Sequence, residues 1–109
     1  MTLRDNRFVA TDLPPRQNDY DCPSLCFSKA DRAVVVMGGH DLRYNLVKSV
    51  ELHNLQTMVW SDLPDLNLAR YIASSCCHGG YIYIFGGYIN KSRDMTNSIE
   101  RLNLSNLRA

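Results

Sequence analysis

Cysteine is the residue type in this chain best suited to bind a metal or to form a covalent link. The four cysteines are Cys22, Cys26, Cys76 and Cys77. Adjacent cysteines on a strand point to opposite faces and cannot share a metal, and Cys22 and Cys26 would lie about 13 Å apart in an extended segment. Cys26 and Cys76 also recur at matching places in two similar stretches, as small buried residues would. We therefore expect buried, reduced thiols, with a metal site or a disulfide as the alternative.

Histidine and glutamate are the other residues that would carry chemistry. His40, His53 and His78 fall in separate elements without the spacing of metal ligands on one helix, so we expect surface or internally satisfied side chains. Glu51 and Glu100 occupy matching positions, and we expect a structural hydrogen bond or a solvated strand edge there instead of an acid–base pair. The sequence thus predicts no catalytic residue, no metal site and no cofactor.

Two diglycines, Gly38-Gly39 and Gly86-Gly87, could in principle cradle a phosphate. No Lys-Ser or Lys-Thr follows either pair and no helical pattern opens after it, which favours a backbone role. Each pair instead ends an apolar run, Ala33–Met37 or Tyr81–Phe85, of residues that prefer strands. The diglycines therefore mark the exits of two buried strands.

The same order of phrases occurs twice along the chain. The apolar runs are 48 residues apart, Ser49–Leu55 matches Ser98–Leu104 at a shift of 49, and Thr11–Pro14 matches Ser61–Pro64 at a shift of 50. A period of about 50 residues built of short strands indicates the blades of a β-propeller.

At this point the chain resembles the kelch repeat family. The resemblance rests on the diglycine after an apolar strand, the phrases around Glu51 and Glu100, Trp60 about twenty residues after the first diglycine, and Arg70 ahead of the next strand. It implies a partial propeller of about two repeats, with a tryptophan packed between blades. The residues that it assigns to the structural motif are Gly38, Gly39, Glu51, Trp60, Gly86, Gly87 and Glu100.

The predicted fold is all-β: a kelch-type β-propeller fragment with one complete four-stranded antiparallel blade and parts of two neighbouring blades. The expected segments are a disordered start over 1–7, the last strand of a preceding blade over 8–15, a complete blade over 20–64, an incomplete blade over 65–104 and a tail over 105–109. A propeller closes at about 4 to 8 blades. We therefore expect that either self-assembly or a longer parent chain completes the ring.

Strand parity predicts where a partner would bind. The expected strands are 24–27, 33–37, 48–54 and 58–63 in the complete blade, then 70–77, 81–85 and 98–104. Antiparallel order places the loops after the second and fourth strands at one end, where Arg, Tyr and Asn side chains suit a peptide. In kelch domains, partners often bind at this mouth, with an arginine near the Arg70 position among the contacts. The candidates are Arg43, Tyr44, Arg70, Tyr88, Asn90, Arg93 and Asp94.

A protein–protein interaction module, such as an adaptor or scaffold, is the leading functional hypothesis. The alternatives are a copper-dependent oxidase-type propeller, a filament-binding scaffold of the cytoskeleton, and a truncated fragment without independent function. The formal net charge of +1 predicts neither nucleic acid nor a membrane surface as a partner. No signal-peptide or spanning pattern is visible, so we expect an unidentified protein partner in a cytoplasmic or nuclear setting.

Overall fold

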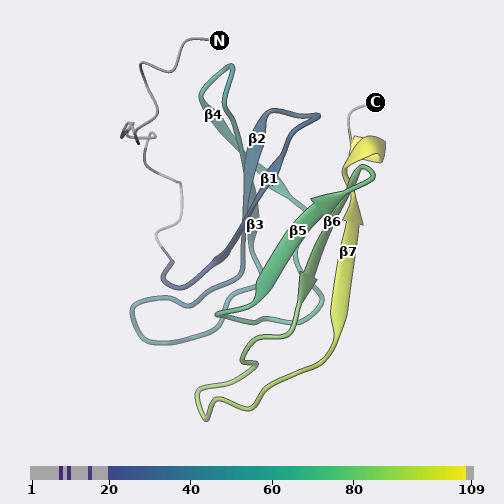
Figure 1. Ribbon diagram of the computed structural model, residues 1–109. Coiled ribbons are helices and arrows are strands. Elements are labelled where there is room, and N and C mark those ends of the chain that lie inside the picture. The colour runs from purple at the N-terminus through teal and green to yellow at the C-terminus, as the bar shows by residue number, and fades with distance from the viewer. Residues whose placement is uncertain (1–7, 9, 11–14, 16–19, 108–109) are drawn as a thin grey trace.

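Two antiparallel sheets, packed face to face, make up the computed structural model, which describes residues 8, 10, 15 and 20–107 (Figure 1). The first sheet, here blade 1, has the order β1-β2-β3-β4, and the second, blade 2, has the order β5-β6-β7. The strands are β1 (Ser24–Ser28), β2 (Ala33–Met37), β3 (Val50–Asn54), β4 (Val59–Leu63), β5 (Ser74–His78), β6 (Tyr81–Phe85) and β7 (Ile99–Asn103). The predicted all-β fold with one complete four-stranded blade is confirmed.

The strands begin and end close to where the apolar runs and turn residues predict. β2 and β6 coincide with the two runs before the diglycines. The fifth strand begins later than expected, at Ser74 instead of residue 70, because Tyr71 forms an isolated bridge with Tyr88 and Ile72 adopts a φ of 52° that interrupts an extended strand. The third strand likewise begins at Val50 instead of residue 48.

The two ends of the predicted segmentation have different outcomes. The predicted disordered start over 1–7 lies outside the described residues, and so does most of the predicted strand over 8–15, of which residues 8, 10 and 15 are described and are not in a strand. The predicted tail is structured at its beginning: Leu104–Leu107 form a 3-10 helix, η2, and Leu104 is buried. The backbone N–H of Leu104 donates to the carbonyl of Gly80 at 2.9 Å, which fixes η2 to the β5–β6 turn.

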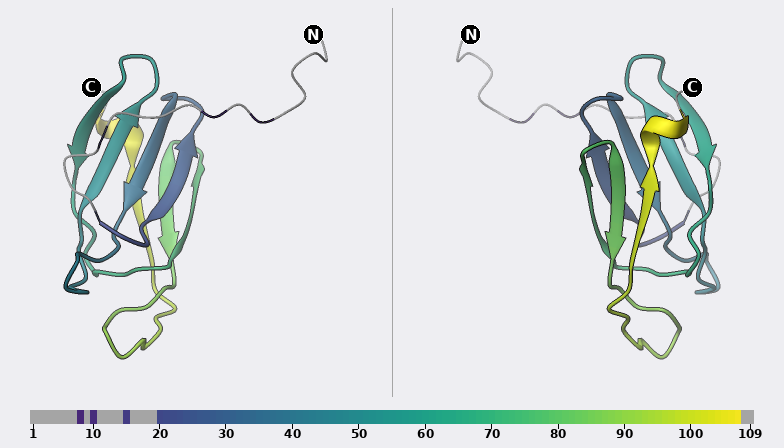
Figure 2. Two further views of the ribbon diagram at one scale, coloured as in Figure 1. Left: turned by 90° about the vertical axis from the view of Figure 1, so that its left-hand side faces the viewer. Right: turned by 90° about the vertical axis from the view of Figure 1, so that its right-hand side faces the viewer.

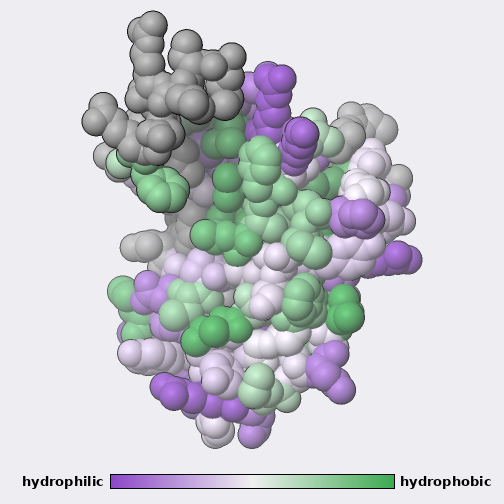
Figure 3. All heavy atoms as spheres, in the orientation of Figure 1, coloured by the Kyte–Doolittle hydropathy of each residue, from purple (hydrophilic) through white to green (hydrophobic). Residues whose placement is uncertain are grey.

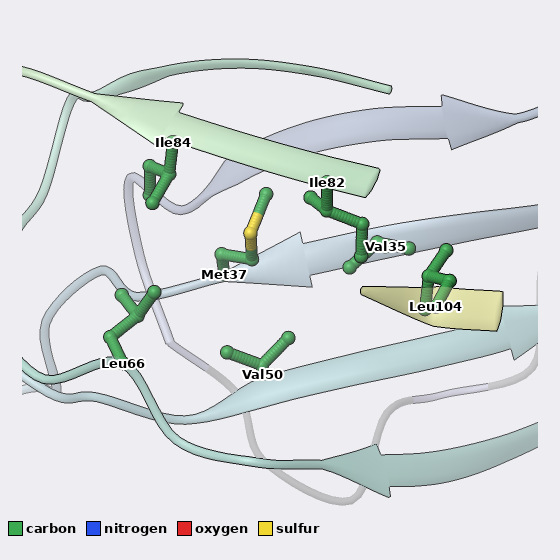
Figure 4. Close-up of a cluster of buried hydrophobic side chains, with 7 residues drawn as sticks. All are labelled: Val35, Met37, Val50, Leu66, Ile82, Ile84 and Leu104. Carbon is green, nitrogen blue, oxygen red and sulfur yellow. The ribbon is translucent and has the colours of Figure 1, made fainter. Parts of the chain in front are cut away.

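The core lies between the two blades. Pairing register places alternate residues on one face, so Val35, Met37 and Val50 project from blade 1 toward Ile82 and Ile84 of blade 2 (Figure 4). Leu66 and Leu104 close the two ends of this cluster (Figure 4). Full burial of an isoleucine or valine stabilises a protein by roughly 1.5–3 kcal/mol. This shared cluster therefore holds the blades together.

The opposite faces of both blades carry exposed apolar side chains. Leu25 and Phe27 of blade 1 are 59% and 52% exposed, and Phe85 and Ile99 of blade 2 are 41% and 66% exposed. In the space-filling view of Figure 3, hydrophobic residues lie over the middle of the visible face, and strongly hydrophilic residues lie around them at the top, the right edge and the bottom. No helix within the described residues is long and apolar enough to cross a membrane.

Candidate functional site

The two long loops that follow β2 and β6 lie at one end of the molecule, opposite the short β1–β2 and β5–β6 turns (Figure 2). Isolated bridges tie each loop to the segment that precedes the first strand of its blade, Asp21 with His40 and Tyr71 with Tyr88. The loop after β2 is also joined to the segment before β5, because Gly39 N–H donates to the carbonyl of Arg70 at 2.9 Å. This is the arrangement that strand parity predicts.

A pocket of about 900 Å³ opens between these loops. Both blades contribute to it through their long loops and through the residues just before β1 and β5. Its lining is formed by Asp21, Cys22, His40, Arg43, Tyr44, Leu46, Tyr71, Ile72, Lys91 and Arg93. We refer to it as the loop pocket.

A row of four rings, three of which line the loop pocket, crosses from one blade to the other. Tyr44 stacks on His40 with centroids 4.8 Å apart, and Tyr71 contacts His40 edge-on at 5.6 Å. The ring of Tyr88 lies 5.3 Å from that of Tyr71, outside the lining of the pocket. Tyr44 and Tyr88 are among the predicted residues, whereas His40 and Tyr71 are not. His40 could have been found from the sequence, because it follows its diglycine directly, as the predicted Tyr88 does.

The charges in the loop pocket are predominantly positive. Arg43, Lys91 and Arg93 line it, against the single carboxylate of Asp21. The predicted Arg43 and Arg93 are thus brought together, and Lys91 joins them although the sequence did not single it out. These three exposed cations form an anion-attracting rim beside the row of rings.

Short hydrogen bonds fix the first of the two long loops, the one that follows β2. One carboxylate oxygen of Asp41, Oδ1, accepts from the backbone N–H groups of Arg43 at 2.8 Å and of Asn45 at 2.9 Å. The bond from Asn45 is the main reason that the pKa of Asp41 lies below its ordinary value, and the charge of Lys91 from the neighbouring loop adds to it. The loop is therefore held in one shape when Asp41 is ionised.

The predicted residues Asn90 and Asp94 have the corresponding role in the second loop. The side-chain amide of Asn90 donates to Asp94 Oδ2 at 2.7 Å, and the backbone N–H of Asp94 donates to Asn90 Oδ1 at 3.1 Å. Neither residue lines the loop pocket. They hold the loop that presents Lys91 and Arg93.

Arg70 is predicted from the sequence as a contact residue for a partner at the mouth, but it does not lie at the surface. Its side chain is completely buried and extends into blade 2, where it donates to the carbonyls of Gly86 at 3.1 Å and Ser98 at 3.0 Å, to the hydroxyl of Ser98 at 2.9 Å, and to Glu100 at 2.8 Å. Its own carbonyl accepts from Gly39 of blade 1. Arg70 therefore joins the two blades and has no surface to offer a partner.

Glu100 completes this internal network. Besides pairing with Arg70, it accepts from the backbone N–H groups of Asn67 at 2.6 Å and Leu68 at 3.1 Å. Burial raises the pKa of Glu100, but the bonds from Asn67, Arg70 and Leu68 together outweigh that effect and hold its pKa below the ordinary value. The carboxylate is thus a structural hydrogen-bond acceptor at the edge of the loop segment 64–70.

The first diglycine is where that segment approaches blade 1 most closely. A Cβ on Gly38 would lie 2.5 Å from the carbonyl oxygen of Arg70, and one on Gly39 would lie 2.5 Å from the carbonyl oxygen of Asp21. Both residues also have positive φ, 68° and 104°. Any side chain at these positions would push the loop-pocket segments away from the sheet.

The other motif residues lie farther from the loop pocket. Trp60 on β4 is half-buried and packs on His53 of β3, with ring centroids 4.6 Å apart, on the face of blade 1 turned away from blade 2. Glu51 is buried on that same face. They belong to the packing of blade 1 and not to the rim.

The cysteines are only partly as expected. All four are free, as expected for reduced thiols. The prediction of burial is wrong for Cys22 and Cys76, which are exposed: Cys22 lines the loop pocket, and Cys76 lies on the outer face of blade 2. Cys26 and Cys77 are half-buried between the blades. Within residues 20–107, no group of three or more His, Cys, Asp or Glu side chains is placed to hold a metal ion.

Comparison with known proteins agrees with the repeat found in the sequence. Residues 69–107 match the family model of the kelch motif. Three F-box/kelch-repeat proteins of Arabidopsis thaliana are similar to this chain, with sequence identities of 40%, 33% and 29%. In the same order, the alignments cover 60%, 58% and 62% of this chain, and 15%, 18% and 19% of the relative's length. The chain thus matches less than a fifth of the length of each of these curated relatives.

Proposed function

We propose that this chain, whose residues 69–107 match the family model of the kelch motif, is a protein-interaction module whose loop pocket binds an acidic peptide segment of a partner protein. The observation that carries this proposal is the gathering of three cations beside a row of rings, from both blades, in one pocket. The similarity to F-box/kelch-repeat proteins adds support for an adaptor role.

The chemistry of the rim suits carboxylates. Arginine presents a planar fork of donors that can bind a carboxylate with two parallel hydrogen bonds, and Arg43 and Arg93 are both exposed. Tyrosine and arginine are also the residues most often found at energetic hot spots of interfaces. The whole chain is nearly neutral, so attraction of an acidic segment arises from this local grouping and not from net charge.

The test uses the full chain and a fluorescein-labelled peptide of alternating glutamate and glycine residues, followed by fluorescence anisotropy at low salt. Lys91→Glu should weaken binding by about tenfold, since it turns one attraction into repulsion at the rim. Lys29→Glu is the matched control, because Lys29 is exposed in the β1–β2 turn at the opposite end and should leave the affinity nearly unchanged.

Two further measurements separate a specific site from general attraction. A lysine–glycine peptide should not bind, and Tyr44→Ala should weaken binding of the acidic peptide without changing the charge of the chain. Equal affinity of the Lys91→Glu and Lys29→Glu variants, or no binding of the acidic peptide by the unaltered chain, would refute the proposal.

We also propose that further blades cover the two exposed apolar faces, supplied by other copies or by a longer parent chain. Leu25 and Phe27 on one face and Phe85 and Ile99 on the other lie on strands of the same kind as those that meet in the core. Uncovered apolar faces of this kind are uncommon on monomers. Self-assembly is tested by the molar mass of the chain in solution.

A further inference from the structure

Two cysteines from different blades lie in direct contact. The sulfur atoms of Cys26 on β1 and Cys77 on β5 are 3.2 Å apart. Beside them, the hydroxyl of Ser24 donates to that of Ser75 at 2.7 Å, and the hydroxyl of Ser75 donates to the carbonyl of Leu25 at 2.9 Å. Small side chains on both strands therefore let the two sheets approach closely at this place.

The pair is separate from the other two thiols. Cys76 precedes Cys77 on β5 and so points to the opposite face, and Cys22 lies in the loop pocket. Cys26 and Cys77 are 51 residues apart in the sequence and are half-buried between blades. Neither lies in the row of rings or the cationic rim of the pocket.

We propose that Cys26 and Cys77 are a modification site: they form a reversible disulfide that links blade 1 to blade 2 when the chain meets an oxidised low-molecular-weight disulfide such as glutathione disulfide. A disulfide bond is about 2.0 Å long, so the sulfur atoms need approach by little more than 1 Å. Side-chain rotation with a small shift of the strands supplies that movement.

The reaction balances as two thiol–disulfide exchanges. One protein thiol loses its proton and attacks a sulfur of glutathione disulfide, which breaks the S–S bond and releases one glutathione thiolate. The second protein thiolate then attacks the protein sulfur of the mixed disulfide and releases the other glutathione. The two protein thiols give up two electrons and two protons, which convert one glutathione disulfide into two glutathione molecules.

The surroundings make this exchange slow at neutral pH. Burial, followed by the contact with Cys77, raises the pKa of Cys26 to about 12. The pKa of Cys77 is also raised, mainly by burial, with the hydrogen bond from Cys26 opposing and the charges of Cys76 and Asp31 adding to it. Because the attacking species is the thiolate, the rate should rise about tenfold for each pH unit between pH 7 and pH 9.

A bond at this place would fix the width of the loop pocket, a consequence that rests on the proposed function. Cys22 and Ile72 of the pocket lie just before β1 and β5, and Ile72 N–H donates to the carbonyl of Cys22 at 3.2 Å. The bond would tie together the strands that begin there. We expect the affinity for the acidic peptide to change at least twofold on oxidation.

Two matched double variants of the full chain test the proposal. Cys22→Ser/Cys76→Ser keeps only the contacting pair. After treatment with glutathione disulfide at pH 8, titration with Ellman's reagent should find no free thiol, and the mass of the chain should fall by that of two hydrogens. Its thermal midpoint should rise by roughly 10 °C and fall again with dithiothreitol. Cys26→Ser/Cys77→Ser should form no internal disulfide.

The opposite pattern overturns the inference. A Cys26–Cys77 disulfide is contradicted if Cys22→Ser/Cys76→Ser gains two glutathione adducts and no internal bond. It is also contradicted if an internal bond forms only in Cys26→Ser/Cys77→Ser. Mass and thiol count do not depend on peptide binding. Failure of the loop-pocket proposal is thus distinguishable from failure of this one.

Discussion

Replacing Arg70 with methionine tests whether this residue is the internal link between the blades. The guanidinium is completely buried and makes four hydrogen bonds in blade 2, one of them to the carboxylate of Glu100, whose side chain is 15% exposed. Methionine fills part of the space without supplying a donor. The carboxylate and the carbonyls of Gly86 and Ser98 would then lose these donors.

The expected cost is large relative to the stability of a chain of this size. Removing one partner of a buried ion pair costs about 3–5 kcal/mol, because the other charge stays buried and uncompensated. Total free energies of unfolding are typically about 5–15 kcal/mol. Glu100 keeps the backbone donors of Asn67 and Leu68, so we expect about 3 kcal/mol, the lower end of that range.

Urea unfolding followed by far-UV circular dichroism measures this loss as a lower midpoint at an unchanged slope. Arg101→Met is the matched control, since Arg101 is exposed on the same sheet, where it lies 4.7 Å over the ring of Tyr81, and should cost about 1 kcal/mol or less. Arg70→Lys keeps the charge but loses the fork, and should fall between the two. If Arg70→Met costs no more than Arg101→Met, the argument for a buried link is wrong.

Three further predictions concern the first diglycine, acid stability and assembly. Gly38→Ala should lower the free energy of unfolding in urea by about 2 kcal/mol or more, because its Cβ would meet the carbonyl of Arg70. Gly79→Ala is the control: a Cβ there meets no atom within 4 Å, so only its positive φ should cost about 1 kcal/mol. Equal costs would contradict the close approach at Gly38. Since the pKa of Glu100 is lower in the folded than in the unfolded chain, its contribution is present above the unfolded value and is lost as pH falls through the folded value. The urea-unfolding midpoint should therefore fall less between about pH 5 and pH 3 in Glu100→Gln than in the unaltered chain. Parallel curves of midpoint against pH would contradict this. Light scattering should give a discrete oligomer of about three or four copies if copies complete a ring, and an ordered β-rich monomer would contradict self-assembly.

Much of the fold could be predicted from local patterns. The apolar runs, the diglycines and the repeat period located seven strands, because side-chain alternation and turn residues act over a few neighbours. The clearest error in strand bounds lies before β5, where Tyr71 pairs with Tyr88 in an isolated bridge instead of continuing the strand. Local propensity alone contains no information about that bridge.

The site could be predicted only in part. Parity correctly placed both long loops at one end, and Arg43, Tyr44 and Arg93 do line one pocket. The sequence missed Tyr71 and Lys91, because membership of the pocket depends on how one blade is rotated against the other. It also placed Arg70 at the surface, since its position before a strand does not reveal that its side chain is buried and donates to the carbonyl of Ser98.

The strands, their antiparallel order and the repeat of about 50 residues follow from hydrophobic periodicity and backbone preferences, which local sequence specifies. Which faces of the blades meet depends instead on three-dimensional packing. Packing Ile82 and Ile84 on Val35 and Met37 brings residues about 50 positions apart into contact, and this packing buries Arg70 and sets Cys26 against Cys77. The physical reason is that side-chain contacts between sheets depend on their relative orientation, which no short stretch of sequence encodes.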